Sequence, residues 1–285
     1  MRIGLVLGAG GAFGWAWHLG VLEAVQESLG IDVRGADRVI GTSAGAAMAI
    51  AASSGADTET ILEVILQRPD EATMQRMREL RDEARTPWRW LRPMAPRLLL
   101  APGPLAGARS LVGALPAGVF PTSPLRRFPA PEVWPDNLQV TAVRLEDGER
   151  IVWGEGDDSL ELHDALEASA AVPMLFQPKV IGGRRHIDGA VASATNADVF
   201  DGAELDLVVV SSPMTRPGRR VVRTWAHRHL RRERRTLEGS GTRVIDVHPD
   251  DDTVALAEGY PRENTDAGPL IVARARDLAL TALRE

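Results

Sequence analysis

Apolar and polar positions in the first 85 residues alternate between two patterns. Short apolar runs, which end at Leu7 and at Ile40, are typical of buried strands. Each run is followed by a segment with helical spacing, the first over about 15–29 and the second ending at Gly55; a third helix is expected to begin at Asp57 or Thr58. This alternation predicts a parallel sheet covered by helices on both faces.

Regular patterns resume after residue 135. Two hairpins are expected, 139–143 with 149–153 and 179–181 with 184–187, the second turning at two glycines. The remaining expected elements are helices at 163–171, 219–237 and 271–283 and strands at 205–210 and 243–247. The fold class expected from the whole pattern is α/β, with three layers and a mainly parallel central sheet.

The segment 86–135 differs from the rest because it holds eleven of the 19 prolines. This density excludes a long helix or a central strand, so we expect one domain over 1–285 with a proline-rich cap or loop excursion. Trp88, Trp90 and the leucines at 98–100 lie among arginines there. The segment is either a lid facing lipid or a loop whose Trp and Leu side chains pack on the core, and we favour the loop.

Composition narrows the function classes. The 285-residue chain has a net charge of −6, which argues against nucleic acid as a partner. It has no cysteine, which fits a reducing compartment and excludes thiolate metal sites. No run approaches the ~18 apolar residues of a spanning helix, and the start of the chain resembles a core strand more than a signal peptide. We therefore expect a cytoplasmic protein that contacts membranes peripherally if at all.

The segment Gly-Thr-Ser-Ala-Gly at 41–45 carries the strongest chemical signal. It lies between an expected strand and an expected helix, where a serine at the apex of a tight turn exposes its hydroxyl. Gly41 and Gly45 flank this turn, and a β-carbon at either position would crowd it. Ser43 is thus a candidate nucleophile of a serine hydrolase.

A serine nucleophile needs a base. Sequence order excludes none of the six histidines, and none stands in a context that marks it as the base: His18, His163, His186, His227, His229 and His248. Asp188 is the other candidate, because it ends an expected strand and precedes Gly189 and Ala190. Taken alone, Asp-Gly is better explained by a turn in which the carboxylate bonds its own backbone.

The glycine-rich loop at 8–14 is a candidate third component of a hydrolase site, after the nucleophile and the base. Gly10 and Gly11 allow successive N–H groups to face one cavity at a helix N-terminus, as an oxyanion hole requires. Nucleotide binding is the rival interpretation. The loop lacks the Lys-Ser or Lys-Thr of a Walker loop, and Phe13 stands where the dinucleotide fingerprint needs glycine.

Together, the three parts resemble the patatin-like phospholipases, and in particular bacterial members of that family. The resemblance covers most of residues 1–200 and includes Ser-Ala-Ala-Val-Pro at 169–173 and Gly-Val-Leu at 20–22. Its motif positions are Gly8, Gly14, Gly41, Gly45, Gly189 and Ala190. One departure is Phe13, where the family often has Arg or Lys, and this leaves the substrate preference open.

The resemblance implies a patatin-like fold and a Ser–Asp dyad without histidine. Ser43 would be the nucleophile, Asp188 the base, and the N–H groups of Gly10, Gly11 and Ala12 the oxyanion hole, with no metal or organic cofactor. The implied substrate is a phospholipid or another lipid acyl ester. A carboxylesterase or thioesterase acting on soluble esters and a catalytically silent lipid-binding protein are the alternatives. No oligomeric state is implied.

Eight arginines between 219 and 235 make one expected helix strongly basic. The helix either docks on an anionic membrane surface or presents a solvated face to acidic neighbours, and we favour the solvated face. Its expected buried stripe consists of Val222, Trp225, Ala226, His229 and Leu230.

Overall fold

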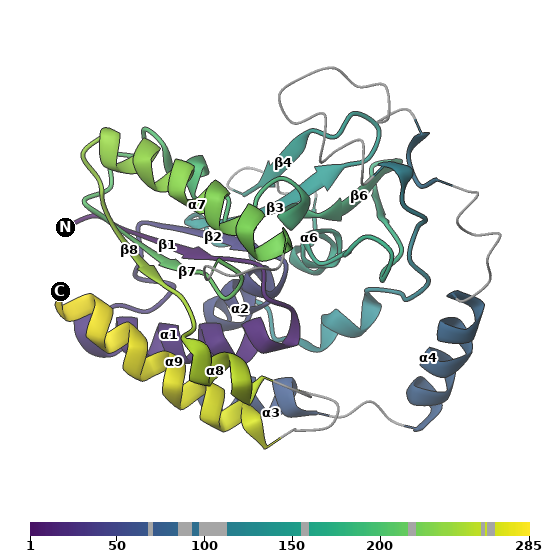
Figure 1. Ribbon diagram of the computed structural model, residues 1–285, viewed down its shortest axis with the longest axis horizontal. Coiled ribbons are helices and arrows are strands. Elements are labelled where there is room, and N and C mark those ends of the chain that lie inside the picture. The colour runs from purple at the N-terminus through teal and green to yellow at the C-terminus, as the bar shows by residue number, and fades with distance from the viewer. Residues whose placement is uncertain are drawn as a thin grey trace.

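The computed structural model describes residues 1–67, 71–84, 93–96, 113–154, 160–215, 221–257, 260 and 266–285. In this part of the chain one mixed sheet lies between two helical layers, which confirms the predicted three-layer α/β fold (Figure 1). The strands are β1 Ile3–Leu7, β2 Arg38–Thr42, β3 Leu138–Arg144, β4 Arg150–Trp153, β5 Lys179–Ile181, β6 Arg184–Asp188, β7 Leu207–Ser211 and β8 Arg243–Val247. The α-helices are α1 Gly11–Leu29, α2 Ala44–Ser53, α3 Thr58–Leu66, α4 Glu71–Ala84, α6 Leu162–Ser169, α7 Val221–Gly239, α8 Asp251–Leu256 and α9 Ala267–Arg284.

The sheet has the strand order β5-β6-β3-β2-β1-β7-β8, and β4 pairs with β3 outside this path. Its centre is parallel: β1 lies between β2 and β7, with Leu7 opposite both Gly41 and Ser211. Both expected hairpins form, β3 with β4 and β5 with β6. Because parallel strands end at one edge of the sheet, the turns after β1, β2 and β7 lie together there.

Helices lie on each face of the sheet (Figure 1). They bury apolar side chains there, as continuous apolar strands require. One core includes Trp17 of α1 and Ile50 of α2 together with α6 and α9. The other core packs Leu230 and Leu237 of α7 against β1, β7 and β8. The face that carries α1, α2 and α9 also supports the expected glycine loop and serine turn.

The two strands that carry the candidate nucleophile and base meet end to end along β3. One edge of β3 is occupied by β4, opposite residues 140–143. On the other edge Thr42, the last residue of β2, pairs with Thr141, while Asp188, the last residue of β6, pairs with the next residue, Ala142. The ends of β2 and β6 are therefore adjacent, although 146 positions separate Thr42 from Asp188.

Element boundaries differ from the expectation at the glycine loop. The first helix begins at Gly11 rather than near Trp15, because Gly10 serves as its N-cap and the Gly14 N–H bonds the Gly10 carbonyl at 3.0 Å. Only 8–10 is loop. The predicted N-cap at Asp57 is confirmed, since its carboxylate accepts from the Thr60 N–H at 2.8 Å.

Much of the proline-rich excursion, with Trp88, Trp90 and the leucines at 98–100, lies outside the described residues. Residues 113–135 are described and include a 3₁₀ turn, η3 Ser123–Arg127. Phe120 forms an isolated bridge to Phe176. No helix among the described residues is long and apolar enough to cross a membrane.

Candidate active site

Ser43 occupies a strained turn between β2 and α2. Its φ of 56° and ψ of −115° lie outside the regions that L-residues favour, as expected of a nucleophile elbow. Both flanking glycines are required for close packing. A β-carbon on Gly41 would lie 2.5 Å from the Ala46 Cα, and one on Gly45 would lie 1.9 Å from the Leu7 carbonyl oxygen. The tight turn predicted from the sequence is therefore present.

The strained turn is held by a hydrogen bond that sequence reasoning did not identify. The Ser43 N–H donates to the hydroxyl oxygen of Ser169, the last residue of α6, at 2.8 Å. Ser169 is fully buried, so this contact replaces water at an otherwise unsatisfied donor. The Ser-Ala-Ala-Val-Pro segment was the available sequence signal, but it did not reveal the contact.

Asp188 lies beside Ser43 and is only 2% exposed. Burial raises the pKa of its carboxyl group to about 7, against the opposing hydrogen bonds from the Ser43 side chain and the Ala190 N–H. The Ala190 N–H donates at 2.8 Å, which is the local Asp-turn expected from the sequence. A second role is open to the same carboxylate, because the Ser43 side chain is near enough to lower its pKa. With a pKa near neutrality, it is a stronger base than an ordinary aspartate.

Gly189 allows this arrangement by lying directly on β3. A β-carbon at Gly189 would come within 2.5 Å of the Thr141 hydroxyl and 2.6 Å of the Thr141 carbonyl oxygen. Any larger residue would push the chain after Asp188 away from the strand that aligns it with Ser43.

The glycine loop is fixed at its base and free at its tip. The Gly8 N–H bonds the Ser211 carbonyl at 2.9 Å, and the Ala9 N–H bonds the Ala194 carbonyl at 2.7 Å. The next three N–H groups, of Gly10, Gly11 and Ala12, have no acceptor among the described residues, and the first turn of a helix offers them none. They are available for an anion at the positive end of α1.

The loop and the serine turn are packed together. A β-carbon on Gly14 would lie 3.0 Å from the Ala44 β-carbon, and one on Gly45 would lie 2.8 Å from the Gly8 carbonyl oxygen. The start of α2 therefore lies against the glycine loop, which brings the predicted oxyanion donors to the same sheet edge as Ser43.

His18 braces this loop and is not a base. The Gly8 carbonyl oxygen, 2.7 Å from Nε2, can only accept, so Nε2 carries the proton. Nδ1 therefore accepts from the Ser211 hydroxyl at 2.7 Å. Burial lowers the pKa of His18 to about 4, so the ring is neutral at pH 7. Both nitrogens are occupied by structural contacts.

The other histidines contact residues other than Ser43, and the buried Nδ1 of His186 has no hydrogen-bond partner within the described part of the chain. His163 donates to the Phe128 carbonyl at 3.0 Å, and His227 lies 3.0 Å from the Thr215 carbonyl. His248 lies 3.3 Å from Asp246. The rings of His186 and His229 contact Trp153 and Trp225. Asp188, at the end of β6 beside the end of β2, therefore stays the candidate base.

Phe13 packs onto the first helix. Its ring stacks on Trp17 with a centroid distance of 6.0 Å, and it borders the main core. The departure from Arg or Lys at this position thus adds apolar packing beside the loop. No group of His, Asp or Glu side chains within the described ranges is arranged to hold a metal ion.

Solved structures with similarity to this chain include the following three. They are VipD from Legionella pneumophila (15% identity, TM-score 0.47), the type III effector protein ExoU (16%, 0.39), and a chain of full-length SpcU in complex with full-length ExoU from the type III secretion system of Pseudomonas aeruginosa (16%, 0.41). The matches cover 99%, 99% and 100% of this chain but 66%, 53% and 53% of those chains. This chain thus spans less than two thirds of each.

A family model supplies the assignment. The model described as "Patatin-like phospholipase" matches residues 5–201, more than half of the chain. The match includes the glycine loop, the Ser43 turn and the segment around Asp188. The chain belongs to the patatin-like phospholipase family.

Proposed function

We propose that this protein is a serine hydrolase that cleaves acyl esters of lipids through a Ser43–Asp188 dyad. Membership in the patatin-like phospholipase family supports lipid hydrolysis in general terms. The observation that carries the finer proposal is that β3 aligns Asp188, at the end of β6, with the end of β2, one residue before Ser43, and that burial raises the pKa of this aspartate to about 7. Such a pair can activate an alcohol without a histidine.

The proposed reaction has two steps. Asp188 takes the Ser43 proton as Oγ attacks the ester carbonyl carbon, and the N–H groups of Gly10, Gly11 and Ala12 stabilise the oxyanion. Collapse breaks the ester bond, and the leaving alcohol takes the proton from Asp188. Asp188 then deprotonates a water that attacks the acyl-Ser43 carbonyl, and it passes this proton to Ser43 Oγ as the bond between Oγ and the acyl carbon breaks, which releases the fatty acid and restores the serine.

Exposed apolar side chains next to the site favour lipid as the substrate. The Asp188 N–H bonds the Ala171 carbonyl at 3.1 Å, and the chain that follows Ala171 exposes Val172, Met174 and Leu175 by 38–44%. We propose that this segment also makes peripheral contact with a lipid surface. The five arginines between 228 and 235 are exposed, and Arg234 pairs with Glu238 at 2.6 Å, which supports the solvated-face interpretation of α7.

The double variant Met174→Ser/Leu175→Ser tests this substrate class. We expect it to lower kcat/KM on phosphatidylcholine vesicles about tenfold, because losing apolar burial worth ~1.4 kcal/mol has that effect. Turnover of nitrophenyl butyrate should stay within about twofold of wild type. Leu270→Ser, at an exposed position on α9, is the matched control. Equal losses on both substrates, or wild-type turnover of nitrophenyl butyrate with none of vesicles, would favour a soluble-ester hydrolase.

The pH dependence tests the base. Only ionised Asp188 can take the serine proton, so kcat/KM should rise with pH and level off above about 7, the raised pKa of Asp188. Measurement with nitrophenyl butyrate between pH 5 and 9 gives this profile. A rate that is constant from pH 5.5 to 9 would be inconsistent with Asp188 as the base.

A further inference from the structure

A carboxylate lies in the apolar stripe of α7. The helix buries Ala226, Leu230 and Leu237 against the sheet, and Glu233 lies on the same face with 6% exposure. The predicted stripe is confirmed at Ala226 and Leu230, but it did not include Glu233. Because burying a carboxylate is costly, the residue needs close hydrogen-bond partners.

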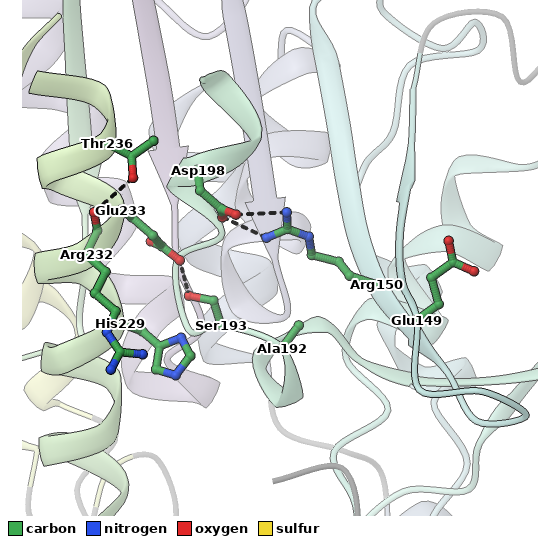
Figure 2. A pocket seen from close by; sticks show the side chains of 9 residues that line it. All are labelled: Glu149, Arg150, Ala192, Ser193, Asp198, His229, Arg232, Glu233 and Thr236. Carbon is green, nitrogen blue, oxygen red and sulfur yellow. Dashed lines mark hydrogen bonds and ion pairs between the residues drawn. The ribbon is translucent and has the colours of Figure 1, made fainter. Parts of the chain in front are cut away.

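Three donors supply these bonds, and all belong to one short loop, 193–197. Glu233 accepts from the hydroxyls of Ser193 and Thr195, each at 2.5 Å, and from the Ala197 N–H at 3.2 Å. Figure 2 shows Glu233 reaching from α7 to Ser193 at a cleft of about 510 Å³ between this helix and Arg150 of β4. Both carboxylate oxygens are therefore used to hold the loop.

The loop 193–197 contacts the candidate catalytic machinery at more than one point. It follows Asp188 by five residues, and the Ala194 carbonyl accepts from the Ala9 N–H at 2.7 Å at the base of the glycine loop. A β-carbon on Gly8 would lie 2.9 Å from that same carbonyl oxygen. A shift of the loop would therefore move the backbone that presents the proposed oxyanion donors.

Asn196 makes the second connection. It is fully buried with a φ of 55°, a left-handed conformation that asparagine tolerates. Its Nδ2 donates to the Ser193 carbonyl at 2.7 Å and to the hydroxyl of Thr42, the residue before Ser43, at 3.0 Å. Its amide group therefore joins the loop to the strand that carries the nucleophile.

Arg150 fixes the orientation of the Asn196 amide. An arginine only donates, and Arg150 Nη1 lies 3.2 Å from Asn196 Oδ1, so Nδ2 must face Thr42. Two hydrogen bonds to Asp198, at 2.7 and 2.9 Å, hold the guanidinium in place (Figure 2). The amide thus has one satisfied orientation.

We propose that Glu233 is a positioning residue of the active site, which holds the loop 193–197 so that Asn196 and Ala194 align the serine turn with the glycine loop. This inference rests on the proposed function. Glu233 acts through the loop and does not touch substrate. Displacements near 1 Å in a catalytic site cost up to ~10²-fold in rate, so loss of these bonds should appear in kcat.

The test compares Glu233→Ala, Glu233→Gln and Glu238→Ala in turnover of nitrophenyl butyrate. Glutamine can keep its oxygen toward Thr195 and the Ala197 N–H, but it loses the bond from Ser193, whose hydroxyl oxygen already accepts from the Thr195 and Asn196 N–H groups. We expect kcat to fall at least tenfold in Glu233→Ala with KM within about twofold, and to recover in Glu233→Gln to at least about threefold above the Glu233→Ala value, because two of the three bonds remain. Glu238→Ala, on the exposed side of the same helix, should match wild type.

Asn196→Ala and the double variant Asn196→Ala/Glu233→Ala complete a double-mutant cycle with Glu233→Ala, which measures the coupling between the two residues. If Glu233 acts through Asn196, the double variant should lose little more kcat than the worse single variant. Wild-type kcat in a folded Glu233→Ala, Gln as impaired as Ala, or fully additive losses would overturn the proposal. Should circular dichroism show Glu233→Ala unfolded, Asn196→Ala and Thr195→Val decide it, and wild-type kcat in both overturns it. Absence of turnover in folded wild type would instead refute the proposed hydrolase function.

Discussion

Asp188→Asn is expected to lower kcat by about 10⁴-fold, as the loss of an aspartate costs in a serine protease triad. The amide oxygen can still accept from the Ala190 N–H, and the side chain keeps its size, but it cannot take the Ser43 proton. Initial rates on nitrophenyl butyrate and on phosphatidylcholine vesicles measure the loss. A variant that retains more than a tenth of wild-type kcat would show that another group is the base.

The same substitution should stabilise the protein at alkaline pH. Burial raises the pKa of Asp188 from 3.8 to about 7, so its stabilising contribution is complete below pH 3.8 and is lost as pH rises through 7. The ionised carboxyl therefore lowers the free energy of unfolding by up to about 4 kcal/mol at pH 8, at ~1.4 kcal/mol for each unit. Urea unfolding should find Asp188→Asn more stable than wild type at pH 8, and the difference should shrink towards pH 4. An equal or lower stability at pH 8 would contradict the buried, destabilised carboxylate.

Gly11→Ala is expected to lower kcat by about 10²-fold or more, the cost of losing one oxyanion donor. Gly11 has a φ of 58°, which alanine adopts only with strain. Nothing lies within 4 Å of a β-carbon there, so the substitution acts through the backbone and not through a clash. Relaxation of φ would rotate the Gly11 and Ala12 N–H groups away from the proposed oxyanion.

Gly182→Ala is the matched control for this prediction. Gly182 has a φ of 56°, and nothing lies within 4 Å of a β-carbon there, as at Gly11. It lies, however, in the turn between β5 and β6. Both variants should lose a similar ~1–2 kcal/mol of stability from backbone strain. Only Gly11→Ala should lose activity. Equal kcat in the two variants would mean that the Gly11 backbone takes no part in catalysis.

The sequence predicted most of the sheet because its signals are local. Apolar runs predicted the strands, and Gly or Asp residues predicted where helices begin or end, such as the start of α3 at Asp57. The expected glycine loop, 8–14, was too long. Gly11 and Gly14 have poor helix propensity, but both lie in the first turn of α1. Packing against α2 and the N-cap at Gly10 outweigh this poor helix propensity.

The proximity of Ser43 and Asp188 could be predicted only through the family resemblance. Their proximity depends on β6 and β2 sharing one edge of β3, a pairing between residues far apart in sequence. Nothing local to Asp188 distinguishes this position from an ordinary Asp-Gly turn. His18 shows the converse, because a candidate base proved to be a brace for the Gly8 carbonyl.

Supporting residues were harder still to recognise. Ser169 lay in a quoted motif, yet its bond to the Ser43 N–H required coordinates. Glu233 had a usable signal, since it falls three residues after Leu230 and four before Leu237 on the buried face of α7. Asn196 had none, because its contacts reach four separate segments of the chain.

The measurement that tests the Ser–Asp dyad most directly is labelling by a fluorophosphonate, with the modified residue located by peptide mass spectrometry. We expect one adduct per chain, on Ser43, with no adduct in Ser43→Ala. Labelling should be at least about 10²-fold slower in folded Asp188→Asn. Folded wild type that takes no label, an adduct on another serine, or Asp188→Asn labelled at the wild-type rate would contradict the dyad.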